Sequence, residues 1–90
     1  MSAVVLVSGA TSGMGLETTL CLARQGYRVF AGYRNDAGRR TLEDHAHELG
    51  DRIIPVPLDV QESISVDRAV ASVLRTAGRL DVLVNNAGYG

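Results

Sequence analysis

Three glycines near the start of the chain, Gly9, Gly13 and Gly15, are the residues whose type and spacing best fit a chemical role. They follow the apolar run 4–7 and are spaced G-x-x-x-G-x-G. Glycines let the backbone approach a ligand closely, and a helix after such a turn directs unpaired N–H groups at an anion. The pattern therefore indicates a phosphate cradle that fits a dinucleotide pyrophosphate. A tight turn without a ligand is the plainer alternative, since the commoner spacing is G-x-G-x-x-G.

The elements that must position this turn alternate along the chain. Apolar runs of strand length occupy residues 3–8, 29–33, 53–58 and 82–85, and amphipathic stretches fill the gaps between them. We expect helices over 14–25, from Asn35 or Asp36 to about residue 50, and from 63 to 77. This βαβαβαβ order predicts an α/β fold of the Rossmann type. It is a parallel sheet of order 3-2-1-4 with helices on both faces and right-handed crossovers.

The apolar periodicity predicts which helix faces are buried. In the first helix Leu16, Leu20 and Ala23 share one face, Cys21 is expected to be buried, and Gly26 stops the helix. In the second helix Gly38 carries a cost of roughly 1 kcal/mol relative to alanine. The residues expected on the buried faces of the second and third helices are Leu42, Ala46, Leu49, Val66, Val70, Val73, Leu74 and Ala77.

Composition excludes several classes of protein. The formal net charge is −1 and 46% of the residues are hydrophobic, which favours neither a disordered chain nor a nucleic-acid binder. Cys21 is the only cysteine, and no Cys/His cluster has metal-ligand spacing, so we expect no metal and a cytoplasmic location. No apolar run approaches the ~18–20 residues that cross a bilayer, so no membrane partner is expected.

Three segments together resemble the amino-terminal part of the short-chain dehydrogenase/reductase family, in its classical branch. They are the segment 8–15, the Asp59–Val60 pair with the leucine before it, and 80–88, which contains Asn-Asn-Ala-Gly. They lie in the family's order, and the resemblance covers essentially the whole chain. The family usually has threonine at the first position of the glycine motif, where this chain has Ser8. The resemblance implies one NAD(P)-binding Rossmann domain over residues 1–90.

The resemblance also implies the roles of particular residues. The glycine loop would hold the pyrophosphate, Asp59 and Val60 would contact the adenine, and the Asn-Asn-Ala-Gly segment would stabilise the sheet and line the ribose side of the cofactor. Without a ligand, Asp59 reads as a cap or a solvated loop acid. The hydroxyl of Ser8 is expected to bridge to the segment after the fourth strand. The cofactor-binding residues predicted in this way are Gly9, Ala10, Thr11, Ser12, Gly13, Met14, Gly15, Asp59, Val60, Asn86, Ala87 and Gly88.

The end of the second strand bears on which nicotinamide cofactor is bound. An acid there would bind the adenosine 2′-hydroxyl, whereas an arginine accommodates a 2′-phosphate. Tyr33 stands where the NAD-preferring pattern has aspartate, and Arg34 follows it with a planar fork suited to phosphate. NADP is therefore predicted over NAD. Asp36 is the alternative ribose partner, and Arg34 could instead be a solvated strand-end charge.

The catalytic residues of the resembled family have no counterpart here. The family transfers hydride between nicotinamide and a carbonyl or alcohol carbon, using a tyrosine, a lysine four residues later and a serine. All nine basic residues of this chain are arginine, so Tyr-x-x-x-Lys is absent. We therefore assign no catalytic residue. We interpret the sequence as the NADP(H)-binding amino-terminal portion of a longer oxidoreductase, one that takes a small-molecule substrate only at full length.

Two other hypotheses stay open. The first is a stand-alone dinucleotide-binding module or partner subunit without catalysis. The second is a methyltransferase-like α/β domain. The motifs at Asp59 and 85–88 disfavour the methyltransferase. The apolar fourth strand would leave an unpaired sheet edge, so a homo-oligomer is also considered.

Overall fold

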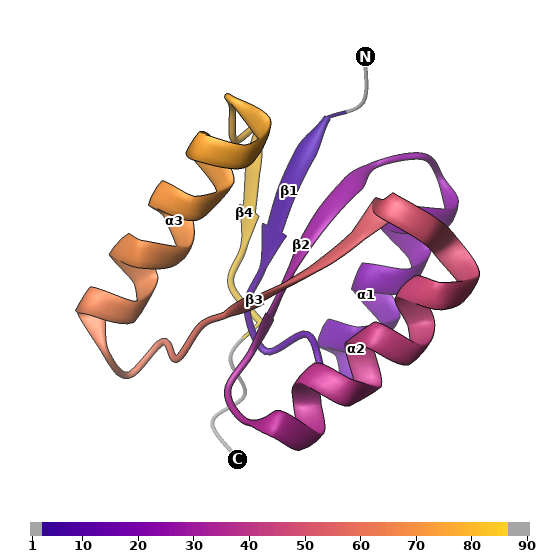
Figure 1. Ribbon diagram of the computed structural model, residues 1–90, viewed down its shortest axis with the longest axis horizontal. Helices are drawn as coiled ribbons and strands as arrows, with labels where there is room; N and C mark the ends of the chain where they lie inside the picture. The colour runs from indigo at the N-terminus through magenta and orange to yellow at the C-terminus, as the bar shows by residue number, and fades with distance from the viewer. Residues whose placement is uncertain (1–2, 87–90) are drawn as a thin grey trace.

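The computed structural model describes residues 3–86, and its elements alternate as the sequence predicts (Figure 1). Strands and helices follow one another from an amino-terminal strand to a short fourth strand, with one 3₁₀ turn between the second helix and the third strand. The elements are β1 (Val4–Val7), α1 (Gly13–Arg24), β2 (Arg28–Tyr33), α2 (Asp36–Leu49), η1 (Gly50–Arg52), β3 (Ile53–Pro57), α3 (Ser63–Ala77) and β4 (Val82–Val84).

The four strands form one parallel sheet in the order β3-β2-β1-β4, which confirms the predicted topology. Helices α1 and α2 cover one face, and α3 covers the other (Figure 1). Alternate residues of each strand therefore enter two separate apolar clusters. In β1, Val5 and Val7 pack toward α1 and α2, whereas Val4 and Leu6 pack toward α3. Burial on both faces explains why these strands read as continuous apolar runs.

The packing face of α1 contains the predicted Leu16, Leu20 and Ala23, and it also contains two small residues that the periodicity did not indicate. The residues buried in this helix are Gly15, Thr19 and Ala23, which recur every four positions, whereas Leu16 and Leu20 are only partly buried beside them. A stripe of small residues lets the helix axis lie close to the sheet, and the Thr19 hydroxyl is satisfied by donating to the Gly15 carbonyl at 2.8 Å. Cys21 is exposed, so the expectation of a buried cysteine is wrong.

The other helices follow the prediction more closely. Asn35 caps α2, because its Oδ1 accepts the Gly38 N–H at 2.9 Å, and Leu42 is fully buried. In α3 the buried residues are Ala69 and Val73, whereas Leu74 is 47% exposed, contrary to expectation. Within residues 3–86, no helix is both long and apolar enough to cross a membrane.

Asp81 fastens the start of β4 to β1. Its Oδ2 accepts the backbone N–H of Val4 at 2.7 Å, and its Oδ1 accepts from Nε and Nη2 of Arg79 at 3.1 and 2.6 Å. The hydrogen bonds from Arg79 and then from Val4 lower the pKa of Asp81 below its ordinary value. A carboxyl group with a lowered folded-state pKa stabilises the fold above its unfolded pKa and loses that contribution as the pH falls through the folded value.

We therefore expect Asp81→Asn to be less stable than the parent chain at neutral pH and equally stable in acid. The difference should be constant above about pH 5 and should shrink below the ordinary carboxyl pKa of ~3.9. Urea unfolding of both proteins across this range measures it. A difference that is the same at acid and neutral pH would contradict the role of the charge.

Candidate cofactor-binding site

The largest grouping of predicted site residues lies in a cleft at the carboxyl end of the sheet. The cleft has a volume of about 550 Å³, within the range of ~300–1,000 Å³ usual for small-molecule sites. In doubly wound folds this edge is where nucleotides bind, because the loops after successive parallel strands meet there. The residues lining the cleft are Gly9, Thr11, Ser12, Gly13, Met14, Gly15, Gly32, Arg34, Asn35, Leu58, Asp59, Val60, Gln61 and Asn86.

The glycine loop has the backbone geometry that the sequence pattern requires. Gly9 and Gly13 have φ angles of 59° and 57°, in the left-handed region that side chains disfavour. Gly15 is needed for a different reason, which is the close approach of two backbone segments. A Cβ on Gly15 would lie 1.9 Å from the Gly9 carbonyl oxygen and 3.2 Å from Nδ2 of Asn86. The loop is therefore folded back on itself, with the Asn86 side chain against it.

The first turn of α1 is suited to an anion. Its N-cap, Ser12, makes no side-chain cap hydrogen bond, and the turn contains no acidic residue. The first N–H groups of a helix have no partner inside the helix, and the positive end of the dipole adds to their attraction for negative charge. Met14, which is 75% exposed, places its side chain on the cleft beside these groups. The residues present thus fit a pyrophosphate.

The start of α2 packs directly on the glycine loop. Gly38 is buried, and a Cβ there would lie 2.7 Å from Cγ2 of Thr11. From the sequence Gly38 is only a cost to the helix, whereas in the structure this contact needs a residue without a side chain. This contact sets the position of the Arg34–Asn35 turn relative to the loop.

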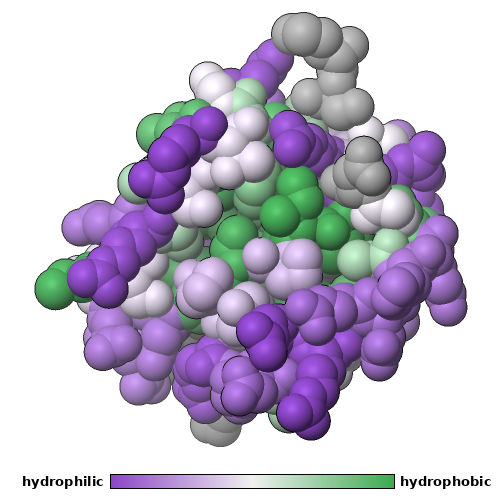
Figure 2. All heavy atoms as spheres, in the orientation of Figure 1, coloured by the Kyte–Doolittle hydropathy of each residue, from purple (hydrophilic) through white to green (hydrophobic). Residues whose placement is uncertain are grey.

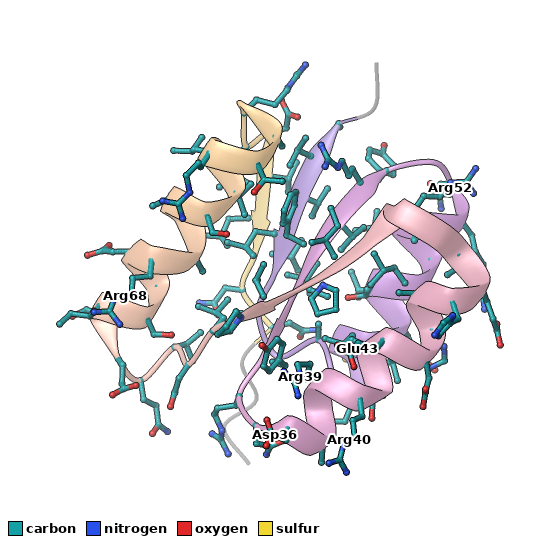
Figure 3. The ribbon with its side chains drawn as sticks, in the orientation of Figure 1. Asp36, Arg39, Arg40, Glu43, Arg52 and Arg68 are labelled. Atoms are coloured by element: carbon teal, nitrogen blue, oxygen red, sulfur yellow. The ribbon has the colours of Figure 1, made fainter. Side chains whose placement is uncertain are left out.

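Arg34 is exposed on the cleft, at the end of β2. Two residues later, Asp36 lies 3.9 Å from Nη2 of Arg39, a solvent-exposed pair on the first turn of α2. Figure 3 shows these two side chains together at the start of the helix, with Arg40 directed away into solvent. Among the residues that the structure describes, Arg34 lines the cleft, and neither Asp36 nor Arg39 does.

The loop after β3 carries the third part of the cleft. Oδ1 of Asp59 accepts the Gln61 N–H at 3.0 Å, and the Asp59 N–H donates to the Ser65 hydroxyl at 2.8 Å. These bonds fix the loop and leave Oδ2 of Asp59 without a partner among residues 3–86. That oxygen is placed to accept a hydrogen bond from a ligand at the cleft.

Ser8 joins β1 to the segment after β4, which confirms the predicted bridge. Its buried hydroxyl accepts the backbone N–H of Asn86 at 2.8 Å and donates to Oδ1 of Asn85 at 3.1 Å. The backbone N–H of Ser8 also donates to the Val84 carbonyl at 2.9 Å. These bonds hold Asn86 at the cleft.

The predicted site residues within 3–86 are thus brought together at the cleft, with Ala10 as the exception. The Ala10 side chain is fully buried in the core and its N–H donates to the Gly32 carbonyl at 3.1 Å, so Ala10 lies beside the cleft rather than on it. Ala87 and Gly88 lie outside the described residues. The cleft residues that sequence reasoning missed are Gly32, Asn35, Leu58 and Gln61. Each lies within two residues of a predicted site residue, and this proximity in the sequence is the signal that could have indicated them.

The parallel sheet, the glycine turn and the cleft above it define a Rossmann-type α/β protein. The chain belongs to the short chain dehydrogenase family, whose model matches residues 3–90. Within residues 3–86 no group of three or more His, Cys, Asp or Glu side chains is placed to hold a metal ion.

Individual relatives agree with this assignment. The chain is 42% identical to an actinorhodin polyketide ketoreductase solved with NADPH, with a TM-score of 0.88 over 97% of this chain and 33% of that one. It is 39% identical to the 3-oxoacyl-acyl-carrier-protein reductase FabG of Thermotoga maritima, covering 94% of this chain and 35% of the relative. Identity to the NADP-dependent 3-hydroxy acid dehydrogenase YdfG of Escherichia coli is 38%, covering 94% and 33%. The chain spans about a third of the length of these relatives.

Proposed function

We propose that this chain binds NADP(H) in the cleft at the carboxyl end of its sheet, as the nucleotide-binding part of an oxidoreductase. The observation that carries the proposal is the cleft itself, which joins the glycine loop, Arg34 and the Asp59 loop on one surface. Relatives of this chain include a ketoreductase solved with NADPH and a dehydrogenase described as NADP-dependent. We extend the proposal to residues 1–90 as one nucleotide-binding domain, in a cytoplasmic protein.

Each part of the cleft has its own proposed task. The first turn of α1 and the loop of Gly9 to Gly15 hold the pyrophosphate with backbone N–H groups. The free carboxylate oxygen of Asp59 accepts from the adenine amine, with Val60 against the ring. Asn86 lies on the ribose side, together with Ala87 and Gly88 by extension of the motif. Ala10 contributes by holding the loop through its bond to Gly32.

Arg34 is the residue that we propose distinguishes NADPH from NADH. A guanidinium group binds the oxygens of a 2′-phosphate through two N–H groups at once and gains little from a 2′-hydroxyl. Arg34→Asp is therefore expected to weaken NADPH binding by roughly tenfold, a modest factor because salt partly screens an exposed charge pair. NADH binding should weaken much less. Fluorescence titration of both cofactors measures the ratio.

Arg40→Asp is the matched control, because it changes the net charge equally at an exposed residue of α2 that does not line the cleft (Figure 3). It should leave the NADPH-to-NADH ratio unchanged. If Arg34→Asp and Arg40→Asp alter the ratio equally, the assignment of Arg34 is wrong. If no dinucleotide binds to the parent chain, the proposed function itself fails.

The reaction proposed for the complete enzyme is hydride transfer between a carbonyl or alcohol substrate and the nicotinamide, which supplies the hydride acceptor or donor when bound. These 90 residues contain no lysine. We therefore expect NADPH binding by this chain without consumption of NADPH when ketone substrates are added. Binding without turnover is also what a stand-alone dinucleotide-binding module would show. Turnover by this chain alone would contradict the absence of a catalytic residue.

A further inference from the structure

The two edges of the sheet differ in their capacity to pair with another strand. The outer strands are β3 and β4. An edge strand presents unpaired N–H and C=O groups, which act as a template for strand addition from a second copy of the chain. Whether an edge can do so depends on which residues point their N–H groups outward.

The register of β3 shows which groups face the open edge. The N–H of Leu58 donates to the Tyr33 carbonyl of β2 at 2.8 Å, and Val56 lies opposite Gly32 in the same ladder. Backbone groups alternate in direction along a strand, so Ile54, Val56 and Leu58 face β2. Residues 53, 55 and 57 therefore face away from β2.

Positions 55 and 57 are the only two prolines of the 90-residue chain. Proline has no N–H group to donate. Both prolines thus fall on the open edge, where they remove two of its three donors, and neither costs a hydrogen bond to β2. Figure 1 shows β3 passing in front of the other strands, and Figure 2 shows that the surface over it, between α2 and α3, is less hydrophilic than the helices around it.

The β4 edge has no such protection in the part of the chain that the structure describes. The Val84 carbonyl accepts from Ser8, so by the same alternation Leu83 faces outward with its N–H intact. Val82 and Leu83 are 47% and 53% exposed. The two edges of the sheet thus differ in the number of outward N–H groups that could pair with another strand.

We infer that Pro55 and Pro57 close the β3 edge against pairing with a second copy of this chain. The inference is independent of cofactor binding, because it rests on the register of β3 alone. It predicts that restoring the two donors converts β3 into an associating edge. Threonine is a suitable replacement, since it favours strands and adds no long apolar side chain.

The test is made in a Leu83→Pro background, which lacks the outward donor of the β4 edge. It compares three proteins: this background alone, the background with Pro55→Thr/Pro57→Thr, and the background with Ala71→Thr. The last variant adds a threonine to the exposed surface of α3. Sedimentation equilibrium should show the double variant associating at a concentration at least roughly tenfold lower than the other two. Equal association of all three, with native circular dichroism, would overturn the inference.

Amide hydrogen exchange measured by NMR on dilute protein gives a second readout. The new amides at positions 55 and 57 should exchange at nearly unprotected rates in the monomer and become protected when the concentration rises. Protection in the dilute monomer would show that they face β2, and the inference would fail. If the double variant does not fold, Pro57→Thr at the exposed end of β3 supports the same two measurements.

Discussion

Gly15→Ala is expected to abolish detectable NADPH binding and to lower the free energy of unfolding by about 3 kcal/mol or more. The added Cβ would lie 1.9 Å from the Gly9 carbonyl oxygen. Because that oxygen belongs to the backbone, it cannot move aside by a change of side-chain rotamer. The glycine loop must therefore open, and the N–H groups proposed to hold the pyrophosphate move with it. Native domains have a total stability of only about 5–15 kcal/mol, so the loss is a large fraction.

Gly13→Ala is the matched control, two residues away in the same loop. A Cβ at Gly13 meets nothing within 4 Å, so only the positive φ of 57° opposes it. That strain costs roughly 1–2 kcal/mol. Thermal unfolding and NADPH titration of both variants measure the contrast. Equal effects of the two substitutions would show that the close approach of Gly15 to Gly9 does not exist in solution.

Ser8→Ala is the second prediction with a large effect, an expected loss of about 1–3 kcal/mol in the free energy of unfolding. The variant leaves the Asn86 N–H without its acceptor in a partly buried place and frees the Asn85 side chain. Because these bonds hold the segment after β4 at the cleft, NADPH binding should weaken as well. Denaturant unfolding and cofactor titration measure the two effects.

Ser8→Thr separates the hydroxyl from the rest of the side chain. Threonine keeps the group that accepts from Asn86 and donates to Asn85, and it is the residue that the family usually has at this position. Stability and affinity should return most of the way to the parent values. If Ser8→Thr loses as much as Ser8→Ala, the volume of the side chain at this buried position matters more than its hydrogen bonds.

Much of the fold was predictable because the strands and turns are marked locally. The four apolar runs and the glycine turn lie where the sequence places them, and Asn35 caps α2 as its residue type favours. The order of the sheet followed from the alternation of strands and helices, which is typical of the Rossmann fold, and from the rules for parallel connections. These features depend on neighbouring residues, which a sequence shows directly.

What the sequence did not predict depends on contacts between distant residues. Periodicity indicated Leu16 and Leu20, which do pack against the core, but it did not indicate Gly15 and Thr19. These two residues are buried because a helix that lies close to a sheet buries its small residues. Gly38 lowers helix propensity, and only the structure shows that the Thr11 methyl leaves no room for a side chain there. Gly32 and Leu58 line the cleft but were not predicted, because the proximity of backbone segments on different strands leaves no pattern in the local sequence.

The contact between Gly38 and Thr11 has a consequence for protein engineering. The start of α2, which follows the turn that carries Arg34, packs against the loop that carries the glycines at this contact, so a change on one side is expected to displace the other. A library that randomises positions 34–37 to switch the coenzyme should therefore keep residues 11 and 38 constant. Substitutions at those two positions are expected to displace the loop proposed to bind the diphosphate, so variants with a new coenzyme preference would be lost from the library.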